Sequence, residues 1–151
     1  MMKTTALALE ELLEKYLPLL NNLRDEEASV KTLPTKWSKK EILGHLIDSA
    51  QNNLRRFIVA QYEEQPKIVY RQDFWVASIH YQEWKLDELI QLWYLTNRQI
   101  VRVLHSMTEE ASARTCETES PRTIGWLAED YLKHLRHHVH QVLGLEEVAY
   151  P

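Results

Sequence analysis

Apolar residues recur every three or four positions over four long stretches of the chain, a period that predicts amphipathic α-helices. These stretches are residues 5–23, 38–64, 86–107 and 123–144. Pro18 lies inside the first helix and should kink it or separate its last turn. Pro66 should stop the second helix, whereas the fourth should begin at Thr123 as its N-cap and end with Gly144 in the C′ position. Four such helices predict an all-α four-helix bundle, with residues 1–151 forming one domain.

The connections between the helices are longer than a simple up-and-down bundle needs, and such connections usually carry function or a crossover. The Ser-Lys-Lys-Glu run at residues 38–41 matches a capping box, with Trp37 placed to pack against the helix as a staple. Residues 65–85 are rich in aromatic side chains and fit either short helical turns or an ordered lid over a pocket. Residues 108–122 are polar and turn-like, and we find no convincing strand pattern.

Composition and charge narrow the class of protein. The 22 acidic residues outnumber the 18 basic ones, and the basic residues are scattered, which argues against nucleic acid as a partner. The single cysteine, Cys116, excludes an intrachain disulfide and lies in a polar stretch, so we expect an ordinary exposed thiol. Glu10 and Glu11 come too early for a signal peptide, and no apolar run approaches the ~18 residues of a membrane span. A soluble, cytoplasmic protein without a membrane partner is therefore expected.

Four of the seven histidines lie between Asp130 and Gln141. His134 and His138 are four residues apart, so they project from one helix face about 40° apart, the spacing with which two imidazoles can bind one metal ion. The helical period places these two at the edge of the buried face, whereas His137 and His140 should lie toward solvent. The alternative is a polar helix edge whose histidines bind nothing.

A third histidine occupies a similar boundary position on the second predicted helix. His45 lies on the edge between the apolar face and a polar stripe, and such stripes are solvated, paired or directed at a cavity. The stripe consists of Glu41, His45, Ser49, Asn52 and Arg56. Asp48 could orient His45 or a bound water. His80 and His105 lack comparable surroundings and are expected at the surface.

The segments WSKKEILGHLIDSAQNNLRRF and DYLKHLRHHVHQVLG together resemble the DinB/YfiT-like family of bacterial metalloproteins. In that family a Trp-Ser/Thr segment followed by His-x-x-Asp-Ser supplies one metal ligand, and His-x-x-x-His on the last helix supplies two. The resemblance places these ligands on His45, His134 and His138. The Asp48-Ser49 pair and the His137-His138 doublet match the YfiT-like branch, and residues 72–75 match its acidic-plus-Trp stretch weakly.

The resemblance implies a four-helix bundle with a three-histidine divalent metal site, often in a homodimer. Family members are described as metal-dependent hydrolases, and relatives include thiol-dependent transferases and a mycothiol-dependent isomerase. The leading hypothesis is an enzyme in which Zn²⁺ or Ni²⁺ activates water or a low-molecular-weight thiol for attack on a small substrate. Asp48 and Asp130 are then the candidate catalytic carboxylates, and Asn52 and Arg56 are the candidates for binding the cofactor or substrate.

Two other functions remain open from the sequence. One is a metal-binding stress-response protein without turnover, whose ion stabilises the bundle or the dimer. The other is an interaction bundle whose histidines bind no metal.

Overall fold

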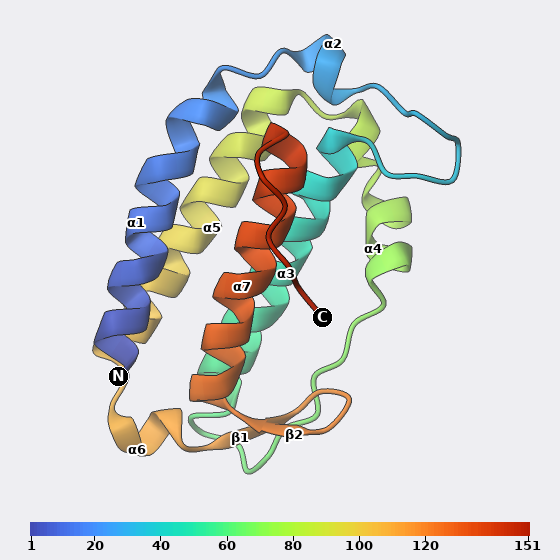
Figure 1. Ribbon diagram of the computed structural model, residues 1–151. Helices are drawn as coiled ribbons and strands as arrows, with labels where there is room; N and C mark the ends of the chain where they lie inside the picture. Colours follow the sequence, from blue (N-terminus) through green and yellow to red (C-terminus); the bar gives the residue numbers. More distant parts are fainter.

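The computed structural model describes residues 1–151 and confirms the predicted four-helix bundle (Figure 1). The four long helices are α1 (Met2–Asn21), α3 (Lys39–Val59), α5 (Leu86–Ser106) and α7 (Ile124–Leu143). The short elements are α2 (Asp25–Ala28), α4 (Gln72–Ile79), the 3₁₀ turn η1 (Tyr81–Glu83), α6 (Glu109–Ser112), β1 (Thr115–Glu117) and β2 (Pro121–Thr123). None of the helices combines the length and the apolar character needed to cross a membrane.

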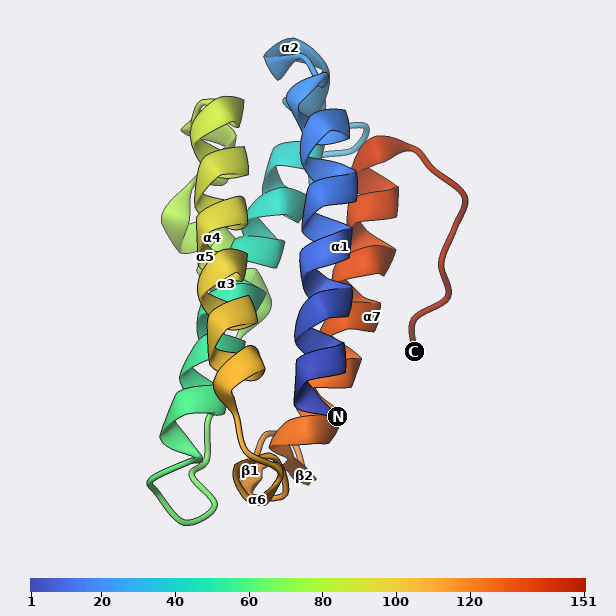
Figure 2. The same ribbon diagram turned by 90° about the vertical axis from the view of Figure 1, so that its left-hand side faces the viewer.

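The order of the helices around the bundle differs from their order along the chain. Helix α1 packs against α5 and α7, and α3 packs against the same two, so α1 and α3 lie diagonally opposite (Figures 1 and 2). Helices α3 and α5 run in the same direction, so residues 60–85 must return along the length of the bundle, carrying α4 on the way (Figure 1). The long connection predicted from the sequence is therefore a crossover.

The core is built from the faces that the apolar period predicted. Fully buried side chains come from all four helices and include Tyr16, Leu46, Trp93 and Leu135. Burying a large apolar side chain contributes about 1.5–3 kcal/mol, so this core outweighs any single surface contact. The polar stripe of α3 is buried or half-buried beside this core.

The helix ends agree with the sequence at most positions. Ser38 forms the predicted capping box with Glu41, Thr123 Oγ1 accepts from the Trp126 amide at 3.1 Å, and Gly144 adopts the left-handed conformation at φ 64°. Helix α1 continues through Pro18 to Asn21, so the predicted separate last turn does not form.

Helix α3 ends at Val59, earlier than the predicted residue 64. The Arg114 guanidinium donates to the carbonyl oxygen of the C-cap residue Ala60 at 2.6 Å and to that of Glu63, beyond the helix, at 2.9 Å. The first contact satisfies a carbonyl group that the helix end leaves without a partner.

Two expectations about residues 108–122 were wrong. Strands β1 and β2 pair antiparallel, with Cys116 opposite Arg122, and each is only three residues long, too short for a sequence period to reveal. Cys116 is fully buried, because its side of the ribbon packs into the core at the end of the bundle, where its thiol donates to the Pro66 carbonyl at 3.3 Å.

Residues 65–85 adopt the short helical turns that the sequence allowed, and Tyr81 fastens them to α3. The Tyr81 ring lies directly over Gly44, where a Cβ atom would come within 2.0 Å of Tyr81 Cδ2. The Tyr81 hydroxyl donates to Asp48 Oδ1. A glycine is therefore required one residue before His45 for this close approach.

We predict that Gly44→Ala lowers the free energy of unfolding by about 1–3 kcal/mol, because the methyl group displaces Tyr81 from Asp48. Gly125→Ala is the matched control, since the nearest neighbour of its Cβ would be the flexible end of Met1 at 3.2 Å. The control should be neutral or stabilising by up to about 1 kcal/mol through helix propensity. Urea denaturation measures both variants, and equal effects would contradict the role assigned to Tyr81.

Candidate metal centre

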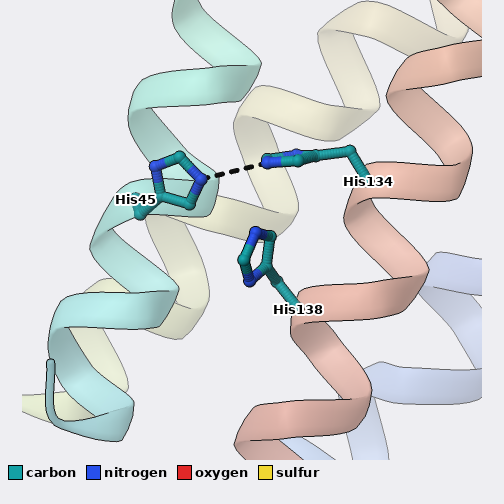
Figure 3. Close-up of side chains that lie close together, drawn as sticks. All are labelled: His45, His134 and His138. Atoms are coloured by element: carbon teal, nitrogen blue, oxygen red, sulfur yellow. Dashed lines mark hydrogen bonds between the residues drawn. The ribbon is translucent and has the colours of Figure 1, made fainter. Parts of the chain in front are cut away.

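Three histidines from two helices converge on one buried space. His45 projects from α3, and His134 and His138 project from successive turns of α7 (Figure 3). Each residue offers one ring nitrogen, and these atoms lie within 4.8 Å of one another. His45 Nε2 and His134 Nε2 are 3.0 Å apart. The structure thus brings together the three residues that the sequence predicted as ligands.

The spacing and chemistry of these nitrogens fit a divalent ion. An ion with tetrahedral bonds of about 2.0–2.1 Å holds its nitrogens about 3.3 Å apart, close to the separation of the two Nε2 atoms. Three protein imidazoles leave at least one coordination position for another group, the arrangement of a catalytic site and not of a closed structural one. The donor set suits Zn²⁺, Ni²⁺ and other transition ions alike.

Burial keeps the three rings neutral. Desolvation is the main cause that lowers the pKa of His45 to about 4, and the charge of His138 adds to it. Desolvation also holds the pKa of His134 far below its usual range, with contributions from the other histidines, and it lowers the pKa of His138. Neutral imidazoles carry the lone pairs that bind a metal, so these ligands are prepared for binding near neutral pH.

Neighbouring side chains support each ring. The Trp37 ring lies 5.0 Å from the His45 ring, Ser49 Oγ lies 3.4 Å from His134 Nδ1, and Gln141 Oε1 lies 2.8 Å from His138 Nδ1. Neither Ser49 nor Gln141 was predicted to support a ligand, although Ser49 belongs to the polar stripe of α3 that the sequence singled out. His45 Nδ1 is buried and has no hydrogen-bond partner.

Asp48 does not orient His45 as the sequence suggested, because no hydrogen bond joins them. Its Oδ1 accepts from Tyr81, and its buried Oδ2 has no partner. Burial raises the pKa of Asp48 to about 6, and the Tyr81 hydrogen bond opposes this shift in part. Asp48 therefore links the crossover segment to α3 beside the histidines.

A cavity of about 510 Å³ opens beside His134. Its wall includes the polar side chains of Arg56, Asp130 and Tyr150, together with residues of the crossover and of the β1–β2 ribbon. Asp130 Oδ2 accepts from the Tyr150 hydroxyl at 2.8 Å. Asn52 does not line this cavity, because its amide is buried and donates to the Asp48 carbonyl at 2.9 Å.

Arg56 carries a charge into this cavity without a carboxylate partner. Its Nε and Nη2 donate to the Ile68 carbonyl at 3.1 and 3.0 Å, and Nη1 donates to Asn53 Oδ1 at 3.3 Å. A guanidinium has five N–H groups, so one on Nη1 and one on Nη2 are left without a protein acceptor. None of the ion pairs in the structure includes Arg56.

The remaining histidines are placed differently from one another. His80 and His105 are exposed at the surface, as predicted. His137 and His140, which the sequence places toward solvent, are half-exposed. Residues 145–151 fold back along α7 (Figure 2) and form hydrogen bonds with both. His137 Nδ1 lies 2.5 Å from the Val148 carbonyl, and His140 Nε2 lies 2.8 Å from the Tyr16 hydroxyl.

A sequence model of the DinB superfamily matches residues 8–142, which include all four long helices except their outermost residues. The chain belongs to the DinB superfamily. This DinB-superfamily chain is 25% identical over 156 aligned positions to a Bacillus mycoides (strain KBAB4) protein named "putative metal-dependent hydrolase", covering 91% of this chain and 87% of that protein.

Solved structures agree on the fold of this DinB-superfamily chain. YfiT from Bacillus subtilis, described as a probable metal-dependent hydrolase with an unusual four-helix bundle topology, superposes with a TM-score of 0.82 at 19% identity, over 96% of this chain and 89% of YfiT. A mycothiol-dependent maleylpyruvate isomerase, solved as a histidine-to-alanine mutant, superposes with a TM-score of 0.79 at 12% identity, over 97% of this chain and 62% of the isomerase. At these identities the likeness establishes the fold.

We predict that the wild-type protein binds one divalent ion per chain and that His45→Ala loses it, because two ligands from one helix hold an ion far more weakly than three from two helices. Mass spectrometry of metals after dialysis against Zn²⁺ or Ni²⁺ measures the stoichiometry. His105→Ala, an exposed histidine on α5, is the control and should retain the ion. Stoichiometric binding in His45→Ala would exclude this centre.

We predict that the metal-free protein loses stability as the pH falls from about 6.5 to about 4. In this range the histidines bind protons in the unfolded chain but stay neutral in the folded protein, because burial lowers their pKa values there. Asp48 acts in the opposite direction, since its raised pKa lets the folded state bind a proton near pH 6. His45→Gln should remove about 3 kcal/mol of this loss, measured by urea denaturation from pH 8 to pH 4. An unchanged pH dependence would contradict the burial of a neutral His45.

Proposed function

We propose that this protein is a metal-dependent hydrolase or thiol S-transferase acting on a small substrate, with a divalent ion, Zn²⁺ or Ni²⁺, held by His45, His134 and His138. The observation that carries the proposal is the position of three neutral imidazoles beside a cavity of about 510 Å³, a volume typical of small-molecule sites. When bound, such an ion polarises a substrate oxygen and makes a water or thiol in its open position more acidic.

The residues around the cavity have distinct roles in this proposal. Arg56 binds an anionic group of the substrate or of a low-molecular-weight thiol through its two free N–H groups, while the reacting end lies toward His134. Asp130, held by Tyr150, is the carboxylate in the cavity wall and can accept a proton there. Asp48 holds the crossover segment to α3 through Tyr81, and Asn52 donates to the Asp48 carbonyl within α3.

The names of the similar proteins support the two reactions unequally. The Bacillus mycoides protein is named for metal-dependent hydrolysis, and YfiT is described in the same way. The isomerase depends on a thiol, which makes thiol transfer the second reaction to test. We also propose that the protein acts as a homodimer and binds neither nucleic acid nor membrane, in line with its scattered basic residues and net charge of −4.

Two assays on the metal-loaded protein separate the reactions. Hydrolysis of nitrophenyl esters without thiol reports the first, and conjugation of monobromobimane or chlorodinitrobenzene to thiols reports the second. We expect one of these activities, and we expect it to disappear in His45→Ala and after chelation. A metal-loaded protein that is no faster than His45→Ala in either assay, but that melts at a lower temperature after chelation, would favour a metal-binding protein without turnover.

We predict that Arg56→Gln raises KM about 10–100-fold for a substrate or thiol that carries a carboxylate and changes kcat little, because the lost contact is made before and during the reaction. An uncharged analogue should show no such change. Arg102→Gln, an exposed arginine on α5, is the control. A KM for the charged compound that is the same in Arg56→Gln as in wild type would contradict this role.

A further inference from the structure

A chain of hydrogen bonds connects the C-terminal segment, residues 145–151, to the metal ligand His138. The Val148 carbonyl lies 2.5 Å from His137 Nδ1, and His137 Nε2 lies 3.2 Å from Gln141 Nε2. Gln141 Oε1 lies 2.8 Å from His138 Nδ1. We propose that Gln141 is a positioning residue of the metal centre, which fixes the tautomer of His138 and is itself oriented by His137 and the Val148 carbonyl. The inference rests on the proposed function only in taking His138 as a ligand.

The hydrogen positions along this series of hydrogen bonds follow from the Val148 carbonyl at one end. A carbonyl oxygen can only accept, so His137 Nδ1 must carry the hydrogen that it donates to Val148. A His137 ring whose single hydrogen is on Nδ1 presents a lone pair on Nε2, and Gln141 then turns its amide NH₂ toward it. The amide oxygen of Gln141 consequently faces His138 and accepts from Nδ1–H.

The consequence for His138 is that its Nε2 carries the lone pair. This is the ring nitrogen left for an ion, because Nδ1 is held by Gln141, and one nitrogen of His138 points to the space between His45 and His134 (Figure 3). Metal-binding histidines usually donate their other ring N–H to an oxygen acceptor, which sets both the tautomer and the ring orientation. Gln141 supplies that acceptor for His138.

Glutamine suits this position better than any other side chain of its length. It offers a donor to His137 and an acceptor to His138 at the same time, from positions three and four residues away on one helix face. Glutamate would still accept from His138 but could not donate to His137. Alanine would leave both rings without their partner.

Several further contacts hold the C-terminal segment, residues 145–151, against α7. His140 Nδ1 lies 2.6 Å from the Glu146 carbonyl, the Leu145 amide donates to the His140 carbonyl at 3.0 Å, and Tyr150 donates to Asp130. The Tyr150 ring also lies 5.3 Å from the ring of His134. This segment therefore supports two of the three ligands from outside the bundle.

The test measures the tautomer in the metal-free protein, so it does not depend on catalysis. Long-range ¹H–¹⁵N NMR at pH 8 distinguishes the Nδ1–H from the Nε2–H form of each imidazole. We expect the Nδ1–H form of His138 in wild type and in Gln141→Glu. In Gln141→Ala we expect a shift toward Nε2–H, the form that a histidine favours in water. Gln99→Ala, a surface glutamine on α5, is the control and should match wild type.

Metal titration gives a second readout on the same variants. Gln141→Ala should bind Zn²⁺ about 10–100-fold more weakly than wild type, and Gln141→Glu should recover the affinity. An unchanged His138 tautomer in a folded Gln141→Ala protein would overturn the inference, as would a loss of affinity that glutamate does not rescue. A protein that binds no metal, yet shows the expected tautomers, would contradict the proposed function and leave the role of Gln141 in orienting His138 standing.

Discussion

Three imidazoles share one desolvated space between α3 and α7, and the chemistry available to this protein depends on their remaining neutral there. Transferring an imidazolium into this space is unfavourable, and three together would repel one another, so each ring keeps only one of its two possible ring protons. A neutral ring retains one nitrogen lone pair, which an ion can bind. Burial thus does more than hide these side chains, because it selects the form that binds metal.

Rigid elements hold His45 opposite the α7 pair. The capping box at Ser38 fixes the start of α3, and the approach of Tyr81 to Gly44 fixes the position of its first turns against the crossover. His134 and His138 are held by the helical spacing of α7 and by its packing against both α1 and α3. A small change in the distance between α3 and α7 would separate the ligand sets, so the packing of these two helices is the structural requirement of the site.

Segments outside the four helices form about half of the cavity wall beside the metal centre, and α3 and α7 form the rest. The crossover contributes Tyr70, the ribbon contributes Arg122, and the C-terminal segment contributes Tyr150 to one cavity wall. Helices α3 and α7 provide the three histidines together with Arg56 and Asp130, and the connecting segments complete the cavity wall.

The sequence by itself determined the four long helices, most of their ends and the pairing of His134 with His138, because all of these are set by short-range periodicity and capping. Residues three or four apart share a helix face whatever the rest of the chain does, so His134 and His138 could be paired from spacing alone. The matching boundary position of His45 on the second helix suggested it as the third ligand, and the resemblance to known metalloproteins selected the same three residues. Only the tertiary structure decided that Cys116 is buried, that Asp48 binds Tyr81 instead of His45, and that Gln141 links His137 to His138. These contacts depend on where a crossover, a three-residue ribbon and a returning C-terminal segment come to rest, and no local pattern along the chain encodes that.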